Sequence, residues 1–265
     1  ARDDHPSDDL SLGLAKGALM TTAIIEDHPE KIRFPLMEER IVGFLLAFMA
    51  GLMNAWTLYH AKTFATVQSG NVLQSGYRLV QGDWSAFIFA FGSVIAFGLG
   101  SALCGVLMTN RLRHGQIFTP VVLWFECIAL LALAIASRLD LVDPHVVAYG
   151  VSFVAGTQGN AFHKDHGMLY GNVAVTFVVQ MAFNFLAQSF FKKTGINGEP
   201  NLMWAGVFFS VLLGFAAGGA IGFYIDMRVI DHASLFLAAA IAVWLALRAK
   251  AQPKAADPTS GGAIA

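Results

Sequence analysis

Long apolar runs separated by short polar segments dominate the chain. Six runs are long enough for transmembrane helices, which need about 20 mostly apolar residues. They cover residues 41–59, 85–109, 117–137, 146–162, 201–225 and 233–247. Two further segments, about 65–81 and 173–191, lie between these runs. The pattern predicts an all-α, polytopic membrane helix bundle with six full spans and two broken or re-entrant segments, or eight spans if both segments cross.

The two halves of the chain share motifs, which predicts a two-fold internal repeat of residues 41–140 and 141–250. "FMAGLMNAW" (48–56) matches "FVAGTQGNAF" (153–162) with one residue inserted, and "SGNV" (69–72) matches "YGNV" (170–173). Each half also has a helix with small residues spaced by four, where a neighbouring helix can approach closely. These are Gly92, Ala96 and Gly100, then Gly214, Gly218 and Gly222.

The distribution of Lys and Arg indicates the topology, because cytoplasmic loops hold most of them. With six spans, eleven positive residues are cytoplasmic: Lys31, Arg33, Arg40, Arg111, Arg113, Lys164, Lys192, Lys193, Arg248, Lys250 and Lys254. Four others are outside, and eight spans give ten and five. Both topologies place a 1–40 tail and a disordered 251–265 tail in the cytoplasm. If only the second segment crosses, the split is seven to eight, which disfavours that topology.

Composition narrows the classes of function. The 265 residues are 56% hydrophobic and 13% charged, with a mean hydropathy of +0.58. The 17 basic and 18 acidic residues offer no basic surface for nucleic acid. Nucleophile elbows, phosphate loops and zinc-protease motifs are absent from the sequence, so we expect neither an enzyme nor a cofactor. "FHKDHG" (162–167) lacks a well-spaced third ligand, so we expect no metal there.

The first polar segment, "TFATVQSGNVLQSGYRLVQGDW" (63–84), concentrates hydrogen-bonding groups around glycines. Discontinuous membrane helices expose peptide groups that bind ions or small polar solutes, which suggests a pathway here. The candidate residues are Gln68, Ser69, Gly70, Asn71, Gln74 and Arg78. A tight helical hairpin, with Asp83 capping the next helix and Trp84 at the interface, is an equally consistent reading of "QGDW".

The second polar segment carries a stripe of polar residues on an apolar helix. They recur every four residues: Asn172, Thr176, Gln180, Asn184 and Gln188. Unpaired amides in hydrocarbon cost several kcal/mol. We therefore expect this face to look into the bundle or a hydrated cavity. The alternative is that the amides join helices to one another, as they do in many membrane proteins.

Further candidates lie within the apolar spans. Glu126 sits in the middle of the 117–137 run, where an ionised carboxylate costs at least about 2.5 kcal/mol. It is a candidate proton or cation relay, paired with Arg78 or an amide cluster, or a neutral packing residue. Asn54 ends the first span, and the matching motif contains Thr157, Gln158 and Asn160.

"AGLMNAWTLY", "FATVQSGNVLQSGYRLVQGDW" and "AGTQGNAF" together resemble the YoaK-type family of bacterial integral membrane proteins, which is known by a domain of unknown function. The resemblance covers about 41–247. It implies an inner-membrane location and about six spans but no substrate. Members usually carry an acid where this chain has Asn54 and Thr where it has Ser69, which weakens any proton-linked role for Asn54.

These patterns support two hypotheses about function. The first is a transporter or permease-like protein for a small polar solute or ion, with a pathway between the two Gly-Asn segments. The second is a non-transporting accessory or assembly subunit of a larger membrane complex. In both, the lipid bilayer is the immediate partner, and the glycine stripes allow a homodimer.

Overall fold

The computed structural model describes residues 39–249 except 115, 163, 166, 167, 170, 174, 196 and 197. The predictions for the two tails therefore lie outside the described residues, as do both histidines and the glycine of the "FHKDHG" motif. Within that range the chain forms eight helices and a short hairpin. They are α2 (Arg40–Ala61), α3 (Gln68–Val80), α4 (Trp84–Arg113), α5 (Thr119–Arg138), α6 (Pro144–Ala161), β1 (Lys164–Asp165), β2 (Met168–Leu169), α7 (Val175–Ser189), α8 (Asn201–Arg228) and α9 (Ala233–Ala249).

The helices coincide with the eight predicted segments to within a few residues. Helices α2, α4, α5 and α8 are long and apolar enough to cross a membrane, and α7 and α9 are apolar but shorter. These helices indicate a membrane protein and confirm the prediction of an all-α membrane bundle.

Local sequence explains where several helices start and stop. Helix α3 is followed by Gly82, whose φ of 74° is readily adopted only by glycine. The Asp83 carboxylate then accepts the Ala86 backbone N–H at 3.1 Å, which confirms the predicted cap of α4. Helix α6 begins in a similar way, with Asp143 as its cap and Pro144 in the first turn. The chain therefore reverses sharply, and α3 packs back against α4.

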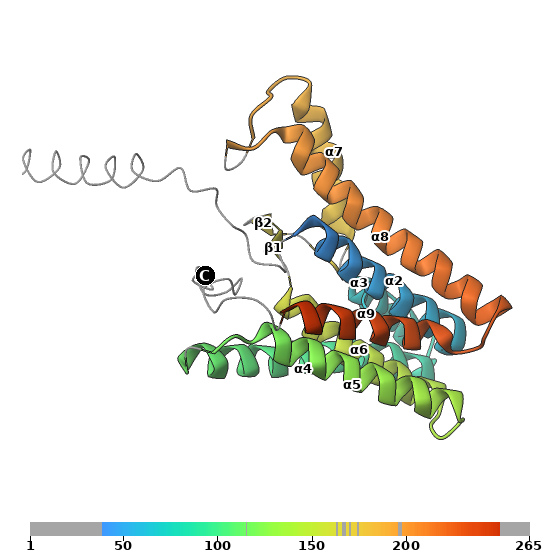
Figure 1. Ribbon diagram of the computed structural model, residues 1–265. Helices are drawn as coiled ribbons and strands as arrows, with labels where there is room; N and C mark the ends of the chain where they lie inside the picture. Colours follow the sequence, from blue (N-terminus) through green and yellow to red (C-terminus); the bar gives the residue numbers. More distant parts are fainter. Residues whose placement is uncertain are drawn as a thin grey trace, which may run out of the picture. The chain divides into compact units, whose positions relative to one another are not determined.

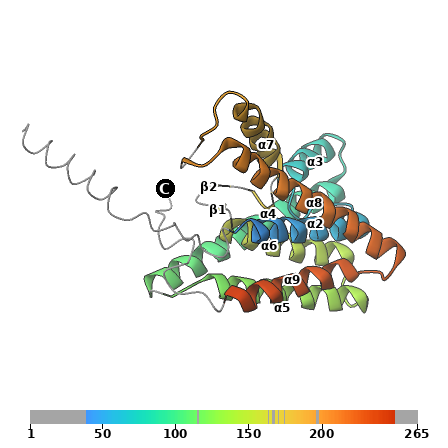
Figure 2. The same ribbon diagram turned by 45° about the horizontal axis from the view of Figure 1, so that its top comes forward.

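The main helix pairs join the two halves of the chain. Helix α2 packs along α8, α4 packs along α6, and α5 packs along α9 (Figures 1 and 2). The short helices α3 and α7 pack against α4 and α8, respectively. Neither half therefore buries its apolar faces by itself, because each of its long helices relies on a helix from the other half.

The α2–α8 pair is closed by two glycines at a backbone-to-backbone contact. A Cβ atom on Gly51 would collide with the Phe215 carbonyl oxygen, and one on Gly218 would collide with the Phe48 carbonyl oxygen. Both collisions are with rigid helix backbone, so neither glycine can carry a side chain without moving the helices apart.

The α4–α6 pair is closed in the same reciprocal way. A Cβ atom on Gly100 would collide with the Phe153 carbonyl oxygen, and one on Gly156 with the Phe97 carbonyl oxygen. In both pairs the sequence Phe-x-x-Gly of one helix therefore crosses the sequence Phe-x-x-Gly of the other. The prediction that small residues permit close helix approach is confirmed at these crossings.

Candidate functional site

Asn54, on α2, fixes the connection between α2 and α3 through hydrogen bonds. Its Oδ1 atom accepts the backbone N–H groups of Ala65 and Thr66 at 3.0 and 3.2 Å. Its Nδ2 atom donates to the Ala50 carbonyl oxygen at 3.1 Å and to the Thr66 hydroxyl. The side chain is buried, and every hydrogen-bonding position of its amide is used.

Asn71, in the first turn of α3, holds the same connection from the other side. Its Oδ1 atom accepts from the Thr63 hydroxyl at 3.1 Å and from the Phe64 N–H at 3.3 Å. Its Nδ2 atom donates to the Phe64 carbonyl oxygen at 2.7 Å and to Gln68 Oε1 and Ser93 Oγ at 3.0 and 3.1 Å. The structure thus brings Asn54, Gln68 and Asn71 around one loop, whose backbone groups they satisfy.

The flanking residues of α3 differ in exposure. Gly70 is half-buried under the Phe64 ring, which lies 3.3 Å from where its Cβ would be, whereas Ser69 is exposed. Ser93 extends this network to the second half, because its hydroxyl lies 2.7 Å from that of Ser152 on α6. The first Gly-Asn segment is therefore bonded to both α4 and α6.

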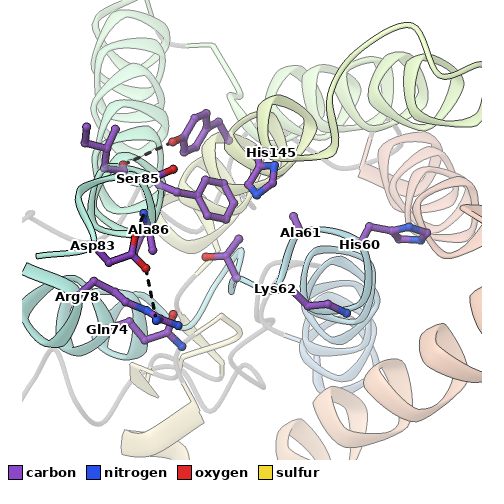
Figure 3. A pocket seen from close by; sticks show the side chains of 14 residues that line it. His60, Ala61, Lys62, Gln74, Arg78, Asp83, Ser85, Ala86 and His145 are labelled. Carbon is purple, nitrogen blue, oxygen red and sulfur yellow. Dashed lines mark hydrogen bonds and ion pairs between the residues drawn. The ribbon is translucent and has the colours of Figure 1, made fainter. Parts of the chain in front are cut away.

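A pocket of about 640 Å³ opens beside this loop, between the ends of α2, α3, α4 and α6. Figure 3 shows Arg78, Gln74 and Asp83 on one side of the pocket and His60 on the other. Its remaining lining is Ala61, Lys62, Thr63, Ser85, Ala86, Ile88, Phe89, Ala90, His145 and Tyr149. Two predicted pathway residues, Gln74 and Arg78, therefore line a real pocket.

Basic groups outnumber acidic groups around this pocket. Arg78 pairs with Asp83 at 3.6 Å, while the Lys62 ammonium donates to the Tyr59 carbonyl oxygen at 2.8 Å. His145 is held by Asp143, whose carboxylate accepts its backbone N–H at 2.8 Å and lies 2.9 Å from its ring Nδ1. These hydrogen bonds, first the backbone one, lower the pKa of Asp143.

The predicted pathway residues on α6, and Asn172 after it, bond to different partners and do not form one cluster. The Gln158 amide donates to the Leu46 carbonyl oxygen of α2 at 2.9 Å, and the Thr157 hydroxyl bonds within its own helix. Asn160 donates to the Ser101 carbonyl oxygen of α4 at 3.1 Å. Asn172, the counterpart of Asn71, donates to the Phe162 carbonyl oxygen at 2.6 Å. Gln158 and Asn160 therefore join α6 to neighbouring helices, and none of the four side chains lines the pocket.

The α7 stripe does not face the core of the bundle. Two of its residues, Asn184 and Gln188, instead line a pocket of about 370 Å³, so the expectation of a stripe facing the bundle or a hydrated cavity stays a prediction. Thr176, Gln180, Asn184 and Gln188 are exposed, and only Asn172 is buried. The buried face of α7 instead contains Val178, Ala182 and Phe185, which pack against α8. The physical reason is that aromatic and aliphatic burial against α8 sets the rotation of α7, so the amides turn outward.

Glu126 is fully buried in α5, and neither of its carboxyl oxygens has a hydrogen-bond partner among the described residues. The predicted pairing with Arg78 is wrong, because Arg78 is exposed and pairs with Asp83. Cys104 of α4 lies near both Glu126 and Asn160. Glu126 is therefore an isolated polar group between α4, α5 and α6.

A second cluster borders the pocket and was missed by sequence reasoning. It joins His60, at the end of α2, to Asp226 near the end of α8 and to Asp231 and His232 in the α8–α9 connection. The available signal was a group of charged residues and a histidine in "DMRVIDH" (226–232), at the end of an apolar span. The cluster forms only with His60, which is far away in the sequence, so the spacing of residues within 226–232 does not predict it.

A family model described as "Protein of unknown function (DUF1275)" matches residues 42–247 and so covers all eight described helices. The chain belongs to the DUF1275 family. This match confirms the resemblance to YoaK-type proteins. Neither the curated proteins nor the solved structures contain a match to this DUF1275 chain.

Proposed function

We propose that α2, α4, α5, α6, α8 and α9 cross the membrane and that α3 and α7 re-enter it. Helices of 13 and 15 residues are only about 20 and 22 Å long, shorter than a hydrocarbon core of about 30 Å. Three spans in each half make the two repeats inverted. The exchange of helix pairs between halves and the two Phe-x-x-Gly crossings support this repeat.

We infer that the protein carries a small polar solute or ion across the bacterial inner membrane. The observation that carries this proposal is the pocket of about 640 Å³ at the base of the short helix α3. Inverted repeats with short, interrupted helices around a polar site are the architecture of many secondary transporters. The excess of basic groups in the pocket favours a small anion over a cation.

Hydrogen bonds next to the pocket determine which helices must separate for transport in this proposal. Asn71 and Ser93 bond α3 to α4, and Ser93 and Ser152 bond α4 to α6. These bonds close the route from the pocket into the bundle. In a transport cycle the Ser93–Ser152 hydrogen bond, which joins the two halves, would break as one half rocks against the other. The Asn71–Ser93 bond lies within the first half and would move with it, and the buried Glu126 would serve as the coupling group.

Proteoliposomes test this proposal directly. Vesicles loaded with a pH-sensitive dye are exposed to gradients of chloride, inorganic phosphate and acetate, and anion uptake and proton movement are recorded. We expect wild-type protein to carry at least one of these anions. Arg78→Ala should reduce that flux more than tenfold, because it removes the pocket's guanidinium, and Arg138→Ala, outside the pocket, should leave it unchanged.

Glu126→Gln separates coupling from binding. The substitution keeps the shape of the side chain and removes its ability to ionise, so proton movement should stop while anion binding persists. Glu199→Gln, outside the bundle core, serves as the matched control. Failure of the wild-type protein to carry any tested anion, or equal flux in Arg78→Ala and Arg138→Ala, would contradict the proposed pathway.

A non-transporting accessory subunit is the second candidate, and the exposed α7 stripe favours it. Thr176, Gln180 and Asn184 lie on an outward face of a helix that we propose to be in the membrane. Polar groups on such a face are suited to helix–helix contacts with another membrane chain. Purification from native membranes without overexpression tests this candidate: a stoichiometric partner lost in Gln180→Leu would favour it over transport.

The orientation is part of the same proposal. With both termini in the cytoplasm, the ends of α2, α5 and α8 and the starts of α4, α6 and α9 share the opposite side of the membrane. The pocket then opens away from the cytoplasm. Labelling of a cysteine introduced at the exposed Gln81 by an impermeant thiol reagent in intact cells checks this assignment.

A further inference from the structure

The cluster beside the pocket has the composition of a metal-binding site. The imidazoles of His60 and His232 and the carboxylate of Asp231 each offer one ligand atom, and these atoms all lie within 4.8 Å of one another. The three residues come from the end of α2 and from the α8–α9 connection. Only the packing of α2 along α8 brings them together.

His60 points into this cluster without a hydrogen-bond partner. Its side chain is only 10% exposed, and its buried Nε2 atom forms no hydrogen bond with any described residue. Carboxylate oxygens lie nearby, at 3.4 Å on Asp231 and at 3.9 Å on Asp226. A buried polar atom without a partner requires an explanation, and a bound ligand is one of the few that suffice.

His232 is held by its surroundings in a position suited to ligation. Its backbone has a φ of 64°, in the left-handed region that residues with a Cβ rarely adopt. Its Nδ1 atom lies 2.7 Å from the Ser137 hydroxyl, and its Nε2 atom lies 3.5 Å from Asp231 Oδ2. A histidine that binds a metal through Nε2 commonly donates its Nδ1 hydrogen to such a neighbouring oxygen.

We propose that His60, His232 and Asp231 bind a divalent transition-metal ion of the zinc class. Two imidazole nitrogens and one carboxylate oxygen form a ligand set that zinc accepts, with the fourth position left for water or a substrate atom. Asp226, anchored by the Ser234 N–H at 2.8 Å, adds negative charge beside the site. The Asp231 side chain is 56% exposed, which gives an ion access.

Binding requires a local rearrangement that can be observed. Ligands around one zinc ion at about 2.1 Å lie roughly 3.3 Å apart, so the side chains must close inward. The imidazoles of His60 and His232 are stacked at 4.2 Å and must turn out of this stack. The Trp56 N–H, which donates to His232 Nδ1 at 3.2 Å, must release it, because the metal-bound ring carries a hydrogen there.

Zinc titration of the full chain in detergent, after chelator treatment, tests the site. Calorimetry should give one saturable site per chain, and both His60→Gln and His232→Gln should weaken it at least tenfold. His145→Gln, which changes a histidine in the neighbouring pocket, is the matched control and should bind as wild type. Ser137→Ala should weaken binding about tenfold, by removing the partner of Nδ1.

Tryptophan fluorescence provides a second readout of the same event. Trp56 stacks on His60 at 4.8 Å and bonds to His232, so zinc should change its emission. That change should disappear in His60→Gln, with thermal unfolding confirming that the variant is folded. Equal zinc binding by wild type and the His60→Gln/His232→Gln double variant, or no binding by wild type, would overturn the site. Neither readout needs transport activity.

Discussion

The two Gly-Asn segments have matching sequences but different degrees of hydrogen bonding. In the first, the Asn71 side chain has five hydrogen-bond contacts, with two N–H bonds shared among three acceptors. Asn54 of α2 supports the same connection and makes four hydrogen bonds. In the second, Asn172 donates to one carbonyl oxygen, and its buried Oδ1 atom has no partner among the described residues. Among the described residues, the same dipeptide therefore makes many hydrogen bonds in one connection and few in the other.

The repeat therefore places an asparagine at matching positions in the two halves, but the two side chains have different hydrogen-bonding roles. The insertion in "FVAGTQGNAF" moves Asn160 one residue beyond the position of Asn54 relative to the crossing glycines Gly51 and Gly156. Asn160 then bonds to α4 and not to its own following loop. One inserted residue in a helix turns a side chain by about 100°, which is enough to change its partner.

Asn71→Leu should give the largest loss of stability. It leaves the partly buried Phe64 N–H and the buried Thr63 hydroxyl without this partner, at about 1–3 kcal/mol for each such group. We expect a total loss of about 2–6 kcal/mol, measured by unfolding in detergent. Gln81→Leu, at an exposed position after α3, should change stability little; an equal loss in the two variants would remove the distinction between the segments.

The two helix crossings should lose similar amounts of stability when their glycines are enlarged, whereas the two Gly-Asn segments should differ. Gly100→Ala and Gly218→Ala each introduce a Cβ against a backbone carbonyl, and overpacking of this kind costs about 1–3 kcal/mol. Gly98→Ala and Gly219→Ala are matched controls, because open space surrounds the Cβ position of each. Thermal unfolding of the four variants checks this, and a large loss in only one half would break the proposed equivalence.

Asn172→Leu should cost less than Asn71→Leu. The substitution leaves the Phe162 carbonyl oxygen without this donor, but it also removes a buried oxygen that has no partner in the described part of the chain. The two effects oppose each other, so we expect a loss of about 1 kcal/mol. Unfolding under the conditions used for Asn71→Leu measures the difference; a loss as large as that of Asn71→Leu would show that the second segment is equally constrained.

Acidification should have the smallest effect, at the cap of α6. Folding lowers the pKa of Asp143, so its carboxylate stabilises the fold above its ordinary pKa near 3.8. This contribution disappears as the pH falls through the lowered pKa. Wild type should therefore lose a small part of its unfolding temperature relative to Asp143→Asn below pH 4, and parallel curves would show that the cap is unimportant.

Periodicity predicted the helices well because each is defined by its own residues. The apolar runs, the Asp83 cap and the small-residue faces of α4 and α8 were all visible locally. The rotation of α7 was not, since both the apolar and the amide face were plausible interiors. Contact of Phe185 with Trp204 and Phe208 of α8 decided it, and that contact depends on how two consecutive helices pack, which the periodicity of α7 alone does not show.

Residue type alone identified the polar candidates in the sequence, but it could not identify the residues that they contact. Glu126 was singled out by its position in an apolar run, whereas its lack of a partner depends on how α4 and α6 pack around it. Nothing in the sequence distinguishes His60, because histidines are common at the ends of apolar spans. Its neighbours Asp226 and His232 are more than 160 residues away along the chain.

The pairing of α2 with α8 also sets a condition on how the chain is made. Residue 61 ends α2 and residue 201 begins α8, so the ribosome must add about 140 residues between them. At about 5–20 residues per second this takes roughly 7 to 28 seconds. During that interval the face of α2 that contains Gly51 is without its final neighbour. Until α8 emerges, this face of α2 therefore lacks the backbone-to-backbone contact that it makes in the folded protein.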